Sequence, residues 1–172
     1  MPKQIKWSTL MLAQLALLTA FCVIGRLLTQ PIPNVQPVTA ILFLVTLYMG
    51  VLPAMIVGVL SIVITNLYLG MGIWTIAQII TFCLLCLLVA GINCLIPLKN
   101  HTGIMLIISF VSGLLYGLLI SILLAPFWGV KSFWPYYFSG LPFDFMNGVG
   151  NACFYLLFSF PISSILTKRF LK

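Results

Sequence analysis

Long apolar segments follow one another along nearly the whole chain, and each is separated from the next by a few turn-forming or polar residues. Of the 172 residues, 63% are hydrophobic and only 5% are charged. A water-soluble domain of this size carries far more charge, whereas about 20 apolar residues are enough to cross a bilayer as a helix. The sequence therefore predicts an all-α integral membrane protein, with residues 1–172 forming a single membrane domain.

Proline, glycine and polar residues divide the chain into six segments. Three prolines between Thr29 and Pro37 forbid a continuous helix there. Residues 50–53 and 70–72 form short breaks, residues 97–103 form a polar loop, and residues 125–140 form a longer aromatic connection. The second segment is short for a full span. The predicted spans are residues 7–28, 38–49, 54–69, 73–96, 104–124 and 141–166.

The distribution of basic residues predicts the orientation of these spans. An even number of spans places both termini on one side of the membrane. Positive charge concentrates at cytoplasmic ends, so we expect cytoplasmic termini in a multi-pass membrane protein. Arg26, Lys131 and Asp144 then fall on the outer side. The residues expected on the cytoplasmic side are Lys3, Lys6, Lys99, Lys168, Arg169 and Lys172.

Asp144 is the only acidic residue of the chain. A carboxylate inside a membrane span costs roughly 2.5–3.5 kcal/mol on insertion scales and normally faces a cavity, a partner or a ligand. Asn147, Asn151 and Tyr155 follow it at helical spacing, within an arc of about 80°. This polar stripe predicts a binding surface on the sixth span.

Two structural explanations for Asp144 remain open beside ligand contact. Pro142 is suited to a first helical turn, which would place Asp144 near the positive end of the helix dipole. Asp144 could also pair with Arg26, because both are expected near the outer ends of their spans.

Further polar and aromatic residues collect on the predicted outer side. Trp74 and Gln78 share one face of the fourth span, Asn66 ends the third, and Tyr116 lies on the fifth. With the loop residues and the stripe, they predict one cavity that opens outward. The candidate binding residues are Arg26, Asn34, Asn66, Trp74, Gln78, Tyr116, Tyr137, Asp144, Asn147 and Asn151.

Known catalytic and metal-binding patterns are missing from the sequence. It has no GxxxxGK[ST] motif, no HExxH motif, no Ser/His/Asp set and no carboxylate pair. The single histidine makes no metal site, and the cysteines are interpreted as small packing residues. We therefore expect no catalytic residue, no metal and no ATPase activity of the chain itself, and interpret it as one subunit of a larger assembly.

Small residues recur on the first span. Ala13, Ala16 and Ala20 follow one another at spacings of three and four residues. Such a face allows another helix to approach closely. The helix could belong to a partner protein or to the same bundle, and the sequence leaves both possibilities open.

Two segments carry a family resemblance that extends over nearly the whole chain. One is Pro33-Asn-Val-Gln-Pro-Val-Thr-Ala-Ile41, and the other is Gly70-Met-Gly-Ile-Trp-Thr-Ile-Ala-Gln78, where relatives commonly read G-x-G-x-W-T-x-x-Q. With six predicted spans and the alanines of the first, the chain resembles the S-components of energy-coupling factor (ECF) transporters. The most similar subset is the cobalamin-specific one.

The resemblance implies a function as well as a fold. S-components bind a vitamin or a related micronutrient from outside, and they dock onto a transmembrane coupling protein and two ATP-binding-cassette ATPases. By this resemblance, the face with Ala16 and Ala20 meets the coupling protein, and the whole subunit topples to deliver its substrate. The vitamin is the transported ligand, the chain has no cofactor of its own, and ATP is used by the partner subunits.

The chemistry of the candidate residues leaves the substrate open. An amide-rich corrinoid suits a wide pocket with amides and aromatic walls. A queuosine precursor, pantothenate, a flavin or a pterin is an alternative ligand. A stand-alone facilitator, or a membrane enzyme or scaffold, is the alternative class of protein.

Overall fold

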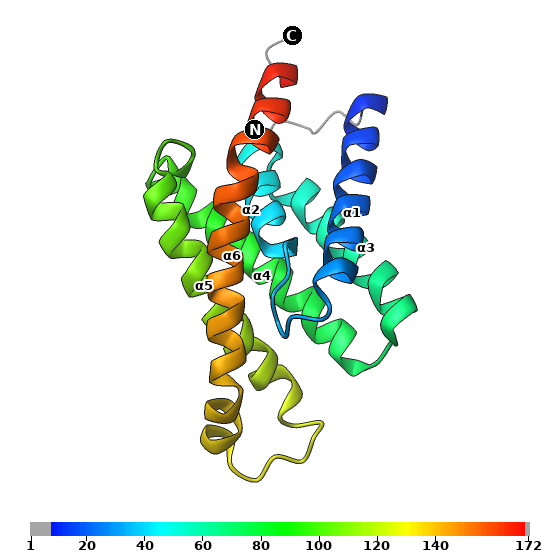
Figure 1. Ribbon diagram of the computed structural model, residues 1–172, viewed down its shortest axis with the longest axis vertical. Coiled ribbons are helices and arrows are strands. Elements are labelled where there is room, and N and C mark those ends of the chain that lie inside the picture. The colour runs from blue at the N-terminus through cyan, green and yellow to red at the C-terminus, as the bar shows by residue number, and fades with distance from the viewer. Residues whose placement is uncertain (1–7, 171–172) are drawn as a thin grey trace.

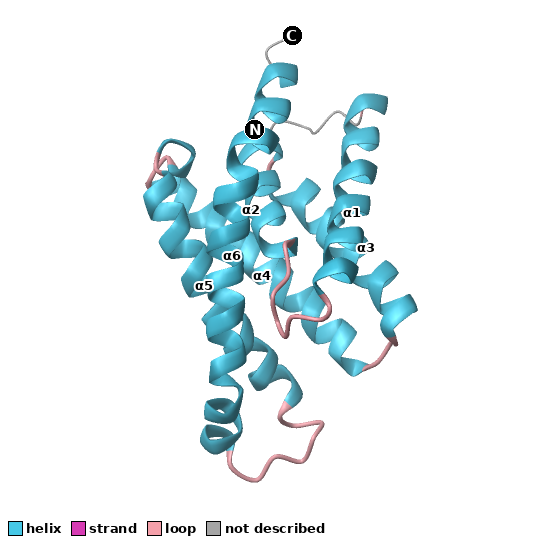
Figure 2. Cartoon of the chain, in the orientation of Figure 1, coloured by secondary structure: helices cyan, strands magenta, loops and turns pink. Residues whose placement is uncertain are grey.

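The computed structural model describes residues 8–170, apart from the side chains of residues 167–170, and this part of the chain is entirely helical or loop (Figures 1 and 2). The predicted all-α fold is therefore confirmed for the described residues. Lys3, Lys6 and Lys172 lie outside them, as do the side chains of Lys168 and Arg169. The elements are α1 (Thr9–Thr29), α2 (Val38–Met49), α3 (Val51–Leu69), α4 (Ile73–Leu95), the short 3-10 turn η1 (Leu98–Asn100), α5 (Thr102–Leu124) and α6 (Phe133–Phe170).

Five of the six α-helices in the described part of the chain are long and apolar enough to cross a membrane. The exception is α2, whose 12 residues extend for only about 18 Å, well short of a hydrocarbon core of about 30 Å. The chain therefore has the helices of a multi-pass membrane protein, while the crossing of the membrane by α2 stays a prediction.

Helix α2 occupies the centre of the bundle. Every residue from Val38 to Leu47 is buried. Helices α3, α4 and α6 all pack against α2, while α3 also contacts α1 and α4, and α5 contacts α4 and α6. Phe21 of α1 meets Phe158 of α6 with ring centroids 5.1 Å apart. A helix that is apolar on all sides has no polar face that must reach water, so α2 can occupy this central place.

The helices run up and down between two ends of the bundle. Helix α1 begins and α6 ends at the same end, at the top of Figure 1, which we call the terminal end. The α3–α4 turn and the α5–α6 loop lie toward the opposite, distal end. At the terminal end, Leu98 of η1 is fully buried and Lys99 Nζ lies 5.1 Å from the centroid of the Tyr48 ring.

Two predicted helix starts are wrong by several residues. Helix α3 begins at Val51 and includes Pro53, and α6 begins at Phe133 rather than at residue 141, with Pro135 in its first turn. Proline fits a first turn because the N–H group it lacks would have no partner there. Half of the predicted aromatic connection is consequently helical.

The early start gives α6 a length of 38 residues, or about 57 Å, which is longer than a bilayer core. Its first turns and the end of α5 project beyond the other helices at the distal end (Figure 1). Pro142 lies inside α6 and not in its first turn. Asp144 is therefore too far from the start of the helix to be stabilised by its dipole, so that sequence-based interpretation is wrong.

Candidate ligand-binding site

Polar side chains from three helices meet in the interior between α1, α3 and α4. Arg26 Nη1 donates a 2.8 Å hydrogen bond to Thr65 Oγ1, and Arg26 Nη2 lies 3.5 Å from Gln78 Oε1. Asn66 Nδ2 donates to Thr75 Oγ1 at 2.9 Å and to Gln78 Oε1 at 2.8 Å. The Gln78 side-chain oxygen thus accepts hydrogen bonds from both Asn66 and Arg26, and these bonds join the three helices.

The turn between α3 and α4 explains why these side chains meet. Gly70 has a φ of 112°, which a residue with a side chain rarely adopts, and it ends α3 with a hydrogen bond to the Asn66 carbonyl at 2.8 Å. Gly72 then caps α4, whose first turn carries Thr75. Asn66 in the last turn of α3 therefore faces the first turns of α4.

Tyr116 of α5 extends this group toward α6. Its side chain is 7% exposed, and its ring lies 5.1 Å from that of Phe82. The phenol group lies beside the Gln78 side chain and within electrostatic range of both Arg26 and Asp144. We call Arg26, Thr65, Asn66, Thr75, Gln78 and Tyr116 the polar cluster.

Asp144 lies next to the polar cluster but is not paired with Arg26. It is 5% exposed, and its carboxyl group lies against the Cα atom of Gly117 on α5, where a Cβ atom would collide with it. The guanidinium group of Arg26 instead donates to Thr65 and Gln78. The Asp144–Arg26 ion pair considered from the sequence is therefore not formed.

The stripe that follows Asp144 forms one buried face of α6, as its spacing predicts. Asn147 is 5% exposed, Asn151 is fully buried, and Tyr155 is 4% exposed. Both amide atoms of Asn151 are buried without a hydrogen-bond partner. A buried, unsatisfied amide costs about 1–3 kcal/mol, which marks Asn151 as a group that needs a partner from outside the fold.

Three candidate residues belong neither to the polar cluster nor to the stripe on α6. Asn34, in the loop before α2, donates a 3.2 Å hydrogen bond to the backbone carbonyl of Phe143. Trp74 is 38% exposed, and its ring packs over Gly72. Tyr137 stacks on Phe133 with ring centroids 6.1 Å apart, in the projecting part of α6. Within the described residues, no hydrogen bond or ring contact joins these three side chains to Gln78 or Tyr116.

Two residues of the polar cluster, Thr65 and Thr75, were missed by the sequence analysis. Thr65 directly precedes the candidate residue Asn66, and Thr75 lies in the segment from Gly70 to Gln78 that carries the family resemblance. A threonine in an apolar helix is common as a packing residue, and its hydroxyl group often bonds to its own helix. Thr65 does this with the Ser61 carbonyl at 2.7 Å, and only the fold adds Arg26 as its second partner.

The alanines of the first span lie on the surface. Ala13, Ala16 and Ala20 are all exposed, so no helix within residues 8–166 covers them. Ala16 and Ala20 line a groove of about 400 Å³ between α1 and α3. The hydroxyl group of Thr19 in this groove is buried without a hydrogen-bond partner. The alternative that this face packs against another helix of the same bundle is therefore wrong for the described residues.

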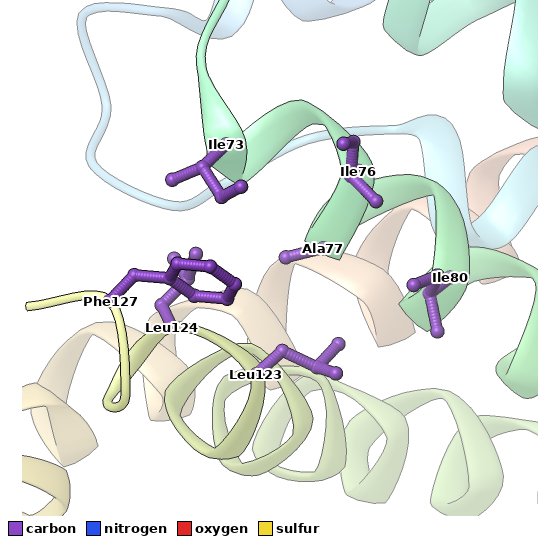
Figure 3. Close-up of a pocket in the computed structure, with 7 residues that line it drawn as sticks. All are labelled: Ile73, Ile76, Ala77, Ile80, Leu123, Leu124 and Phe127. Atoms are coloured by element: carbon purple, nitrogen blue, oxygen red, sulfur yellow. The ribbon is translucent and has the colours of Figure 1, made fainter.

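A second cavity lies between the distal half of α4 and the end of α5. Figure 3 shows its side chains, which are aliphatic apart from one phenylalanine, around a volume of about 310 Å³. A wall of this kind holds apolar groups but offers no side-chain hydrogen bond to orient a polar ligand. The lining residues are Ile73, Ile76, Ala77, Ile80, Leu123, Leu124 and Phe127.

Residues that could bind a metal do not gather anywhere in the described part of the chain. It contains no group of three or more His, Cys, Asp and Glu side chains placed to hold an ion. The polar cluster and the stripe therefore offer amide, hydroxyl, phenol and guanidinium groups, together with one carboxyl group. Such groups bind and orient a ligand by hydrogen bonding and charge.

Comparisons with protein-family models, with curated proteins and with solved structures found no match.

Proposed function

We propose that this chain is the substrate-binding S-component of an ECF-type importer, which captures a vitamin or a related micronutrient from outside the cell. The observation that carries the proposal is the polar cluster, a largely buried group of polar side chains from four helices within a strongly apolar bundle. Hydrogen bonds join its members on α1, α3 and α4. Polar groups buried inside a membrane protein are costly and normally serve a ligand, an ion or a partner.

The residues of the family-like motif and those of the polar cluster coincide in part. Thr75 and Gln78, from the segment that resembles G-x-G-x-W-T-x-x-Q, form hydrogen bonds with Asn66. The glycines of the same segment make the turn that positions them. The agreement between the motif residues and the hydrogen-bonded residues supports the proposed membership of this family.

The side-chain chemistry suits a ligand with amides and a flat apolar surface. Asn66, Gln78, Asn147 and Asn151 provide amide groups, and Tyr116 provides an aromatic wall. A corrinoid such as cobalamin is the best candidate for this set, and a queuosine precursor, pantothenate, a flavin or a pterin is the alternative.

The groove with Ala16 and Ala20 supports the docking part of the proposal. An exposed row of small residues on a membrane helix permits close approach of a helix from another protein. The partners would be the transmembrane coupling subunit, with two ATPase subunits that hydrolyse ATP. The termini are then cytoplasmic, and the distal end faces outward in the bacterial cell membrane.

Ligand binding by the purified protein tests the proposal most directly. Mass spectrometry of small molecules carried through purification would identify the ligand, and equilibrium binding of cyanocobalamin, riboflavin and pantothenate would rank the candidates. We expect Asp144→Asn to insert normally and to bind the ligand more weakly, because its carboxyl group lies beside the polar cluster. Unchanged affinity in detergent would remove Asp144 from the site.

Assembly and transport discriminate between the classes of protein. A tagged chain is expected to co-purify with a coupling protein and two ATPases from its own cells. Uptake by the chain alone in liposomes, without these partners, would instead identify a stand-alone facilitator. Chemical conversion of a bound ligand would identify an enzyme.

A further inference from the structure

Arg26 carries a buried positive charge that meets only neutral groups. It is 7% exposed in the last turn of α1, and its hydrogen-bond partners are Thr65 and Gln78. The contact with Gln78 is long, at 3.5 Å. A guanidinium group has five N–H donors, so most of its donors make no hydrogen bond to a side chain.

The chain itself holds almost nothing that could neutralise this charge. Asp144 is the only acidic side chain in the sequence, and its carboxyl group lies against Gly117 rather than against Arg26. The carbonyl end of α1 offsets part of the charge through the helix dipole. A buried cation without a full counter-charge is strongly disfavoured, so an additional anion would stabilise this part of the fold.

The surroundings hold the guanidinium group in place. Asn66 donates to both Thr75 and Gln78, which fixes the Gln78 carbonyl oxygen that Arg26 approaches. Thr65 accepts a hydrogen bond from the other terminal nitrogen of the guanidinium group, Nη1. A planar guanidinium held in this way matches the two oxygens of a carboxylate or a phosphate better than a flexible ammonium group does.

We propose that Arg26 binds an anionic group, a carboxylate or a phosphate, on the ligand that enters the polar cluster. This inference rests on the proposed function and narrows its substrate class. Ligands with one such group, including the phosphodiester of cobalamin and the carboxylate of pantothenate, fit this requirement, whereas an uncharged ligand leaves Arg26 without a partner.

Thermal unfolding of the ligand-free protein in a neutral detergent tests whether Arg26 binds an anion, and it does not require that the ligand is known. Sodium acetate and sodium phosphate are each compared with sodium chloride at equal ionic strength. We expect both anions to raise the Tm of the wild type by several degrees and to leave that of Arg26→Gln unchanged. Lys131→Gln is the matched control, since Lys131 is an exposed cation of the α5–α6 loop, and it should respond like the wild type.

Arg26→Lys provides a second variant that keeps the charge but not the planar fork. Its response to acetate and phosphate should lie well below that of the wild type. An equal response in Arg26→Gln or Arg26→Lys would overturn the proposal, and so would the lack of any anion-specific shift in the wild type. If Arg26→Gln does not fold, the comparison of Arg26→Lys with the wild type decides.

The same titration separates a soluble ligand from a lipid. If phosphatidylglycerol added to the micelles raises the Tm through Arg26, and acetate and phosphate do not, the anion is a lipid headgroup and the proposal is wrong. Co-purification with a coupling protein and ATPases does not depend on any of these titrations. A missing anion response with intact co-purification would therefore reject the anion site and leave the proposed function standing.

Discussion

The Cα atom of Gly113 on α5 lies against the backbone of Gly148 on α6, so closely that a Cβ atom on Gly113 would collide with main-chain atoms. Main-chain atoms cannot rotate away as a side chain can. This contact holds the two helices together at the level of Asn147, in the middle of the polar stripe. Close approach of small residues of this kind is typical of helix pairs in membranes.

We expect Gly113→Ala to lower the stability of the protein by about 1–3 kcal/mol, because the added methyl group forces α5 and α6 apart. Thermal unfolding in detergent measures the effect. Gly91→Ala is the control, since Gly91 on α4 has no atom near the position of a Cβ, and alanine there should be neutral or slightly stabilising. Equal stability of the two variants would contradict the close contact.

The contact between Gly117 and Asp144 predicts coupling between two substitutions. A Cβ atom on Gly117 would occupy the position of the Asp144 carboxyl group. Gly117→Ala should therefore destabilise the wild type and should cost much less in an Asp144→Ala background, which removes the group it displaces. A double-mutant cycle of Tm values measures the coupling, and strictly additive effects would show that the two residues do not touch.

Substitution of Asn151 is expected to raise stability and to weaken ligand binding. Asn151→Leu removes two buried amide atoms without partners, so the ligand-free protein should gain about 1–3 kcal/mol of stability while ligand binding weakens. Thermal unfolding and equilibrium binding measure the two effects separately. Asn100→Leu, at an exposed position of η1, is the control and should change neither. A loss of stability in Asn151→Leu would mean that the amide is satisfied in the fold.

The groove on α1 predicts a defect in assembly alone. Ala16→Leu and Ala20→Leu fill the groove between α1 and α3, so we expect each to abolish uptake and co-purification with the coupling protein, and to spare ligand binding. Cys94→Leu, at an exposed position near the end of α4, adds similar bulk elsewhere and should behave like the wild type. Normal uptake by both alanine variants would show that this face is not a docking surface.

Much of the helical framework could be predicted because its signals are local. Prolines between residues 29 and 37 separate α1 from α2, and the predicted range of α2 agrees with the structure at both ends. The starts of α3 and α6 were predicted too late, because Pro53 and Pro135 were interpreted as breaks although a first turn tolerates them. The spacing of Asp144, Asn147, Asn151 and Tyr155 predicts that they share one face of a helix, and the structure shows that this face of α6 is buried. The binding surface predicted there stays a prediction.

The sequence by itself determined an all-helical, strongly apolar chain, a single acidic residue and the helical face that Asp144 shares with Asn147 and Asn151. Only the tertiary structure decided that α2 is central, that Arg26 bonds to Thr65 and Gln78 rather than to Asp144, and that Tyr137 stacks on Phe133 in the projecting part of α6. The physical reason is that spacing and helix breakers act within a few residues of the chain. Which apolar helices become neighbours depends on the close fit of their surfaces, to which glycines such as Gly113 and Gly117 contribute through contacts with a distant helix.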